Sequence, residues 1–290
     1  MYLQHFGLAQ YPFSLTPNTH FFLKLPSHVE AFNRLIAALE NQGGFVKITG
    51  EVGTGKTMLC RKVLNALENH RSRYVSAYIP HPILSEEAML HALAEELSME
   101  YKSTASYYEM LKLVTEQLVK LSNEKKFVVL FIDEAQAMPE ETLEAIRLLC
   151  NNIGNDKKLL QVVLFGQPEL DTLLQGPVLR QLNNQISFAY KLPALDRDGL
   201  EAYISHRLGK AGYNGAVMFS RASLDQLYQA SGGIPRLINI LAHKSLLAAY
   251  GKGQQLVDSK HVSDAILDTE SATQKADSIF KRLMSRQDLL

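Results

Sequence analysis

The stretch Gly50-Glu51-Val52-Gly53-Thr54-Gly55-Lys56-Thr57 decides how this chain folds. An apolar segment at residues 45–48 leads into it, and a helical pattern begins directly after it. Glycines at such a turn let the backbone N–H groups point inward toward an anion. The following helix presents its positive end to the same anion. The spacing G-x-x-x-x-G-K-T, in this strand–loop–helix context, therefore predicts a cradle for phosphate groups.

Two side chains of this loop have expected roles. Lys56 can reach the β- and γ-phosphates of a nucleotide, and Thr57 can place its hydroxyl on Mg²⁺. A glycine-rich turn with an accidental Lys-Thr is the alternative, which the flanking strand and helix disfavour. The expected ligands are ATP and Mg²⁺. The residues expected to contact the nucleotide here are Gly50, Glu51, Val52, Gly53, Thr54, Gly55, Lys56, Thr57 and Met58.

The amino-acid composition of the chain reduces the number of functional classes to which it can belong. The chain has 290 residues, with 30 Lys+Arg against 30 Asp+Glu, so its net charge does not indicate a nucleic-acid or anionic-membrane partner. No apolar run approaches the roughly 18 residues that span a bilayer, and no secretory leader pattern opens the sequence. Cys60 and Cys150 have no metal-site spacing and are expected to be buried thiols in a reducing compartment. We expect a cytoplasmic protein whose contact with a membrane goes through a partner.

Strand and helix patterns alternate over the first two thirds of the chain. The segment 127–132 is continuously apolar, which is typical of a strand buried on both faces of a parallel sheet. The alternation predicts a doubly wound α/β sheet. Five strands are expected, at about 45–49, 74–79, 127–132, 160–165 and 186–192. Helices are expected at about 27–41, 56–69, 85–98, 106–123, 140–151 and 169–174, with a polar stretch at 175–185.

The composition changes at both ends of this α/β domain, which we place at 27–193. Residues 1–26 form an arm rich in aromatic residues and proline, expected to pack over the body of the domain. An aromatic binding strip is the alternative, formed by Tyr2, Tyr11, Phe13, Phe21 and Phe22. Ser27 is expected to cap the first helix, with Glu30 completing a capping box.

After Pro193 the pattern is entirely helical. A lid domain is expected at 194–270, with helices at 196–210, 220–231, 234–250 and 258–268. The tail 271–290 carries apolar residues at helical spacing, and either a partner-binding helix or a frayed terminus fits that pattern.

Asp133-Glu134 directly follows the buried strand 127–132. Acidic residues at the carboxyl end of such a strand lie where ligands bind in open α/β folds. Asp133 is expected to hold Mg²⁺, and Glu134 to orient and activate the water that attacks the γ-phosphate. A pair of helix-capping carboxylates is the alternative.

Two further polar residues fit the same site. Gln167 ends the next buried strand and can reach a water or a phosphate oxygen; a turn residue before Pro168 is the alternative. Arg236 follows Gly232-Gly233-Ile234-Pro235 at the start of a helix, where a cation is mildly unfavourable. Because a cation is unfavourable at this position, a contact of Arg236 with the γ-phosphate is favoured over the alternative of a solvent-exposed arginine without a function.

These features resemble those of AAA+ ATPases. Residues 50–57 look like Walker A, residues 128–134 like Walker B, Gln167 like sensor 1, and Arg236 like the sensor-2 arginine. More narrowly, about residues 1–268 resemble the ExeA (general secretion pathway A) family. The landmarks that carry this narrower resemblance are Phe6-Gly7-Leu8, Tyr11-Pro12-Phe13, Pro17, Phe21-Phe22, Asp133-Glu134-Ala135-Gln136, Gly166-Gln167-Pro168-Glu169-Leu170 and Gly232-Gly233-Ile234-Pro235-Arg236.

The resemblance implies a P-loop NTPase of the AAA+ type that hydrolyses ATP, with a helical lid that closes through Arg236. It also implies self-association into a ring, a hexamer, and partners in a pilus or secretion assembly at the bacterial inner membrane. ExeA proteins continue into a transmembrane helix and a periplasmic domain, which this sequence does not show. It is therefore expected to be closest to the shorter MshM ATPases associated with biogenesis of the mannose-sensitive haemagglutinin type IV pilus.

One departure affects the expected rate. The family commonly has an arginine before the last strand, where this chain has Gln185. An arginine offered there by a neighbouring subunit stabilises charge on the γ-phosphate, and losing it costs orders of magnitude in rate. Either Arg180 takes that role, which makes it the third catalytic candidate beside Lys56 and Glu134, or the protein is a nucleotide-gated scaffold with little turnover. A solvated surface charge is the plainer reading of Arg180.

A DNA-handling ATPase of the transposition-regulator kind is the rival class, because its core has a similar pattern. It requires a basic stripe, and the balanced charge makes a nucleic-acid partner the weaker expectation.

Overall fold

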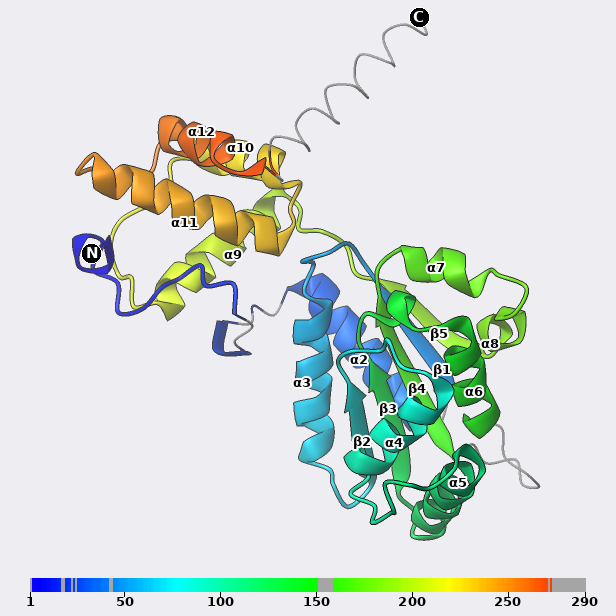
Figure 1. Ribbon diagram of the computed structural model, residues 1–290. Coiled ribbons are helices and arrows are strands. Elements are labelled where there is room, and N and C mark those ends of the chain that lie inside the picture. The colour runs from blue at the N-terminus through cyan, green and yellow to red at the C-terminus, as the bar shows by residue number, and fades with distance from the viewer. Residues whose placement is uncertain are drawn as a thin grey trace, which may run out of the picture. The chain divides into compact units, whose positions relative to one another are not determined.

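The computed structural model describes residues 2–16, 19–21, 23, 25–41, 44–150, 159–270 and 272 (Figure 1). These residues form two compact units. The sheet unit comprises Pro26–Glu51 and Lys56–Leu192. The helical unit comprises Met1–Leu25, Val52–Gly55 and Pro193–Leu290. Apart from Ala272, the predicted tail lies outside the described residues, as do the arm residues Pro17 and Phe22.

The sheet unit is built on a sheet that contains five strands within the described residues. They are β1 (Phe45–Thr49), β2 (Tyr74–Ile79), β3 (Phe127–Ile132), β4 (Leu160–Gly166) and β5 (Ile186–Lys191). All neighbours pair in parallel, in the order β2-β3-β4-β1-β5. The predicted parallel five-stranded sheet is confirmed. Its strand order places the carboxyl ends of β3, β4 and β1 side by side, and the order reverses around β1, where open α/β sheets bind ligands.

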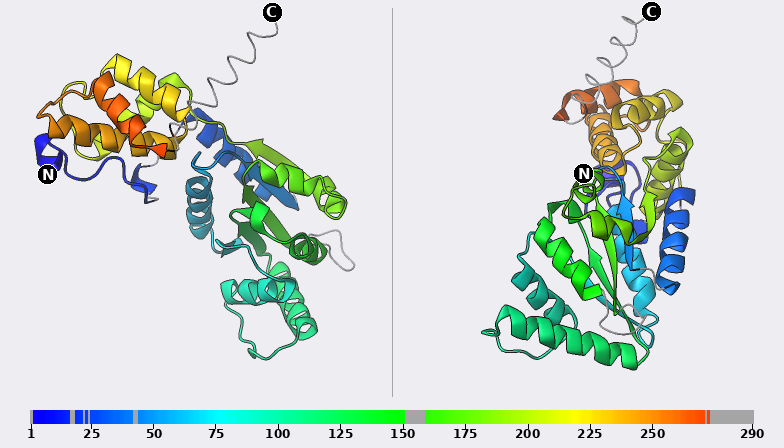
Figure 2. Two further views of the ribbon diagram at one scale, coloured as in Figure 1. Left: turned by 45° about the horizontal axis from the view of Figure 1, so that its top comes forward. Right: turned by 90° about the vertical axis from the view of Figure 1, so that its right-hand side faces the viewer.

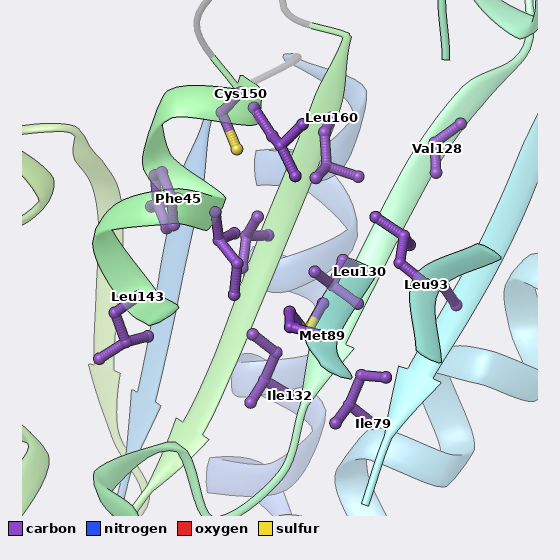
Figure 3. Packing of buried hydrophobic residues seen from close by; sticks show 14 of the residues in the cluster. Phe45, Ile79, Met89, Leu93, Val128, Leu130, Ile132, Leu143, Cys150 and Leu160 are labelled. Atoms are coloured by element: carbon purple, nitrogen blue, oxygen red, sulfur yellow. The ribbon is translucent and has the colours of Figure 1, made fainter. Parts of the chain in front are cut away.

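Helices cover both faces of this sheet (Figure 2). On one face, α2 (Pro26–Glu40) and α3 (Lys56–Glu68) bury their apolar side chains against one set of strand residues. On the other, α4 (Glu86–Glu96), α5 (Tyr107–Asn123) and α6 (Glu140–Cys150) pack on the alternate set. Phe45, Val128, Leu130 and Leu160 point into this second layer together with Met89 (Figure 3). Burial on both faces explains why β3 and β4 are apolar at nearly every position.

Two local expectations about the sheet unit are wrong. Ser27 does not cap α2, because the helix already begins at Pro26; proline is favoured at a first helical position, where its missing N–H costs nothing. The apolar side chains that α2 buries are Ala31, Leu35 and Leu39. The polar stretch before β5 also contains a short helix, α8 (Arg180–Asn184), which follows α7 (Glu169–Leu174).

The helical unit packs four helices around one apolar cluster. They are α9 (Arg197–Lys210), α10 (Arg221–Ser231), α11 (Pro235–Gly251) and α12 (Ser259–Leu267). None of the described helices of the chain is long and apolar enough to cross a membrane.

The N-terminal arm belongs to this helical cluster and not to the α/β body on which it was expected to lie. It contains α1 (Tyr2–His5) and a single 3₁₀ turn (Thr19–Phe21). Four of its apolar side chains are almost completely buried among the helices: Tyr2, Phe6, Phe13 and Phe21. The alternative of an aromatic binding strip therefore fails for three of its members, since Tyr2, Phe13 and Phe21 are core residues, and only Tyr11 is exposed among those described.

A buried arginine of α9 fastens the arm. Arg207 Nε donates to the Pro12 carbonyl at 2.5 Å, and its Nη2 donates to the Ser14 carbonyl at 3.2 Å. Its guanidinium lies 4.8 Å from the centre of the Phe21 ring, within the range of a cation–π contact. Two segments of the arm, at Pro12–Ser14 and at Phe21, thus contact one side chain, which is only 7% exposed.

Replacing Arg207 by alanine is expected to lower the free energy of unfolding by roughly 2–4 kcal/mol, because two arm carbonyls lose a charged donor and Phe21 loses its cation. Urea denaturation followed by circular dichroism measures the change. The matched control is the exposed Arg221→Ala on α10, which should leave the midpoint unchanged. Equal midpoints for both variants would show that the arm is held by its apolar residues alone.

Candidate active site

The phosphate loop joins β1 to α3 with two backbone turns that favour glycine. Gly53 has φ +86° and Gly55 has φ +102°, a region that side-chain-bearing residues rarely adopt. The N–H of Gly50 donates to the Gly166 carbonyl at 3.2 Å, which ties the start of the loop to the end of β4. The loop therefore begins at the end of β1, where the strand order reverses. It ends at the N-terminus of α3, which begins at Lys56.

The tip of the loop, Val52–Gly55, is part of the helical unit. The N–H of Arg236, in the first turn of α11, donates to the Gly53 carbonyl at 3.3 Å. A Cβ added at Gly53 would lie 2.6 Å from the Cβ of Arg236, so the approach requires glycine. The structure thus brings Arg236 to the phosphate loop, with its side chain exposed.

In the Gly232-Gly233-Ile234-Pro235-Arg236 segment, a close approach of the Leu195 backbone explains the glycine at position 233. Gly233 has φ +74°, and a Cβ added there would lie 1.9 Å from the Leu195 carbonyl oxygen. Pro235 then starts α11. Any side chain at Gly233 would displace the start of this helix, and with it Arg236.

Lys56 is buried and bound to the loop itself. Its Nζ donates to the carbonyls of Gly50 at 2.8 Å and Glu51 at 3.1 Å. Burial lowers the pKa of Lys56 below its usual value, while the carboxylates of Glu134 and Asp133 act in the opposite direction. The cation is therefore held inside the curl of the loop, where phosphate oxygens are expected.

Thr57 and Asp133 form the second part of the site. Thr57 Oγ1 donates to Asp133 Oδ2 at 2.7 Å, so the hydroxyl after Lys56 meets the carboxylate at the end of β3. Mg²⁺ is usually held by one or two carboxylates together with phosphate oxygens and water. A hydroxyl and a carboxylate in direct contact beside a phosphate loop fit that ion.

Glu134 occupies an unusual backbone position. Its φ of +51° and ψ of +39° lie in the left-handed region, which is uncommon for a residue with a side chain. Its Oε2 accepts from Gln167 Nε2 at 3.0 Å and from Gln136 Nε2 at 2.7 Å. Burial alone would raise the pKa of Glu134, but these two hydrogen bonds and the charge of Lys56 outweigh it and lower the pKa. Glu134 is thus an ionised carboxylate at the edge of the sheet.

Two residues of this site were missed from the sequence. Tyr78, on β2, points its hydroxyl at Asp133 Oδ2 at 3.4 Å, and burial raises its pKa, so it stays a donor. Gln136 holds Glu134 and also accepts the backbone N–H of Gln167 at 3.0 Å through its Oε1. The Asp-Glu-Ala-Gln sequence was the available signal for Gln136.

Arg180 is not brought to this cluster. It begins α8 with an exposed side chain, and within the described part of the chain it has no hydrogen bond or ion pair to a residue of the site. Gln185 ends the same short helix. The expected role of Arg180 toward a neighbouring subunit stays a prediction.

Residues 39–174 match the family described as AAA domain. The fold is similar to that of Cdc6p from Pyrobaculum aerophilum, with a TM-score of 0.70 and 19% identity over 89% of this chain and 70% of that one. The chain has an AAA P-loop NTPase fold. The ORC2 protein of Aeropyrum pernix, solved as ADPNP–ADP complexes, shares this AAA fold with a TM-score of 0.63 and 17% identity over 90% of this chain and 72% of that one.

A sequence relative covers both units. The chain is 41% identical over 258 residues to the general secretion pathway protein A of Aeromonas hydrophila. The match includes 89% of this chain and 46% of that protein, so the chain spans about half the length of its relative. The expected narrower likeness to MshM ATPases stays a prediction.

Proposed function

We propose that this chain binds Mg-ATP and hydrolyses it to ADP and phosphate. The observation that carries the proposal is the ionised Glu134 carboxylate, fixed at the end of β3 beside the Thr57–Asp133 pair. A hydrolase of this kind needs a base to take a proton from water, and an anion cradle to hold the γ-phosphoryl group. Here the base follows β3 and the cradle follows β1, the two strands that flank β4 in the sheet.

Each residue has a separate part in this proposal. The loop glycines and the start of α3 bind the phosphates through backbone N–H groups. Lys56 exchanges its loop carbonyls for phosphate oxygens, and Thr57 and Asp133 hold Mg²⁺. When bound, the ion neutralises charge on the phosphates. Gln167 orients Glu134, and Arg236 carries a positive charge to the loop tip.

Steady-state release of phosphate from ATP, with and without Mg²⁺, tests this proposal. Turnover that needs Mg²⁺ and saturates with ATP is expected. Tight ATP binding without measurable release would instead support the nucleotide-gated scaffold, and no binding would reject the assignment of the loop.

The name of the sequence relative supports a biological process in which this activity takes part, namely secretion. A general secretion pathway protein at 41% identity favours work on a secretion or type IV pilus assembly at the inner membrane, with the chain itself on the cytoplasmic side. Co-purification from cells that assemble such a machine, with the Lys56→Ala variant as control, tests it. The expected result is capture of an inner-membrane component by the wild type and loss of that component with the variant.

We also propose that subunits assemble so that Arg180 of one reaches the nucleotide of the next. Its exposure at the start of α8 supports a role toward a neighbour. Arg180→Ala is expected to lower turnover by about 10³-fold with ATP binding unchanged, because an arginine supplied in this way stabilises transition-state charge. Phosphate release and nucleotide titration measure the two effects, and the exposed Gln181→Ala is the control.

A mixing experiment shows whether the arginine acts between subunits. Arg180→Ala subunits keep an intact phosphate loop, whereas Lys56→Ala subunits keep Arg180. Mixing the two inactive variants should restore part of the activity, because one supplies the loop and the other the arginine. Two inactive variants that stay inactive when mixed in an assembled form would reject action in trans.

A further inference from the structure

Three side chains at the ends of β3 and β4 form a closed hydrogen-bonded cycle. Gln136 Nε2 donates to Glu134 Oε2 at 2.7 Å, and Gln136 Oε1 accepts the backbone N–H of Gln167 at 3.0 Å. Gln167 Nε2 closes the cycle by donating to the same Glu134 Oε2 at 3.0 Å. Gln136 thus connects a carboxylate after β3 with the backbone after β4.

The backbone is arranged to permit this cycle. The left-handed conformation of Glu134 turns the chain at once into a 3₁₀ turn at Ala135–Ala137. This reversal brings Gln136, two residues later, back to face the Glu134 carboxylate. A left-handed glutamate is unfavourable unless its surroundings hold it, and such residues gather at active sites.

Gly166 leaves the space that the Gln136 amide fills. A Cβ added at Gly166 would lie 3.1 Å from Gln136 Oε1 and 2.7 Å from a methyl group of Leu170. The absence of a side chain at the end of β4 therefore lets the amide reach the Gln167 N–H.

The cycle leaves the two oxygens of Glu134 unequal. Oε2 receives both amide donors, and among the described residues no hydrogen bond is made to Oε1. A carboxylate held by one oxygen has a fixed plane, and its second oxygen keeps a defined direction.

We propose that Gln136 is a positioning residue for hydrolysis: with Gln167 it holds Glu134 by Oε2, so that Oε1 is aimed to accept the proton of the attacking water. This inference rests on the proposed ATP hydrolysis. In that step the water oxygen forms a bond to the γ-phosphorus, its proton passes to Oε1, and the bond from phosphorus to the ADP oxygen breaks, giving ADP and phosphate. Gln136 has its part through Glu134 and the backbone of Gln167.

The test replaces Gln136 by methionine, which keeps the length of the side chain and removes both hydrogen bonds. Turnover is expected to fall roughly 10²-fold, the loss typical of a reacting group misplaced by about 1 Å. The Kd for ATP should stay within about twofold, because the hydrogen bonds of Gln136 within the described part of the chain go to Glu134 and Gln167 and not to the loop or to Lys56. The exposed Gln175→Met serves as the control.

A double-mutant cycle separates positioning from a merely structural role. In a Glu134→Gln protein the carboxylate no longer takes the proton, so adding Gln136→Met should cause no further loss of turnover. Equal fold-losses in the two backgrounds, or a wild-type rate for Gln136→Met alone, would overturn the inference. A Glu134→Gln protein that hydrolyses ATP as fast as the wild type would also overturn the inference, because another group would then take the proton. A wild-type protein that releases no phosphate from ATP would instead overturn the proposed function.

Discussion

ATP binding is expected to weaken by roughly 10²-fold when Lys56 is replaced by alanine. A hydrogen bond to a charged group contributes about 1.5–3 kcal/mol, and each 1.4 kcal/mol changes a Kd about tenfold. Lys56 is 4% exposed and already donates to two carbonyls of the loop, so it is held at the site before ATP arrives. Titration with a fluorescent ATP analogue measures the loss.

A matched variant makes this result specific. Lys112, on α5, is an exposed lysine whose ion pair with Glu116 spans 3.9 Å. Lys112→Ala should bind ATP as the wild type does. Lys56→Ala should also keep a similar melting temperature, because removing a buried amine relieves its desolvation while it loses two hydrogen bonds. Tight ATP binding by a folded Lys56→Ala protein would reject the assignment of the phosphate loop.

Glu134→Gln is expected to lower turnover by about 10²–10⁴-fold while ATP binding is kept. The amide oxygen of glutamine can still accept from Gln136 and Gln167, so the geometry of the cycle survives. An amide cannot take a proton from water, so the chemical step is lost. Single-turnover release of phosphate from bound ATP measures that step directly.

The exposed Glu141→Gln on α6 is the control for this change, and it should turn over at the wild-type rate. Together the two active-site variants separate ATP binding from ATP hydrolysis. Lys56→Ala should lose binding, whereas Glu134→Gln should keep binding and lose hydrolysis. A Glu134→Gln protein as active as the wild type would mean that another group takes the proton.

The sheet could be predicted because its signal is local. Continuous apolar runs, as at 127–132, have one stable solution when helices alternate with them, which is burial between two helical layers. The loop at 50–57 was equally visible, since its glycines sit where the structure has positive φ at Gly53 and Gly55. The positions of Asp133 and Glu134 near this loop could then be predicted, because the carboxyl ends of parallel strands lie at the same end of the sheet.

The parts that could not be predicted depend on side chains far apart in sequence. The arm packs on helices about 200 residues later, through Arg207 and Phe21, and no local pattern shows which apolar surface it will cover. Gln136 was unrecognised because its role depends on the left-handed backbone of Glu134, which a glutamate does not signal. Lys56, Asp133 and Glu134 are therefore visible in the sequence, whereas Gln136, which donates to Glu134, is not.

The helical unit combines segments that lie far apart in the sequence, and this affects how the protein folds during synthesis. Tyr2, Phe6 and Phe13 leave the ribosome well before the helices that bury them, α9–α12. Strand β1 likewise emerges early and obtains both its neighbours, β4 and β5, only after more than a hundred further residues have been synthesised. The nascent chain therefore exposes aromatic side chains and an unpaired strand until these later segments emerge, and exposed segments of this kind are prone to aggregate.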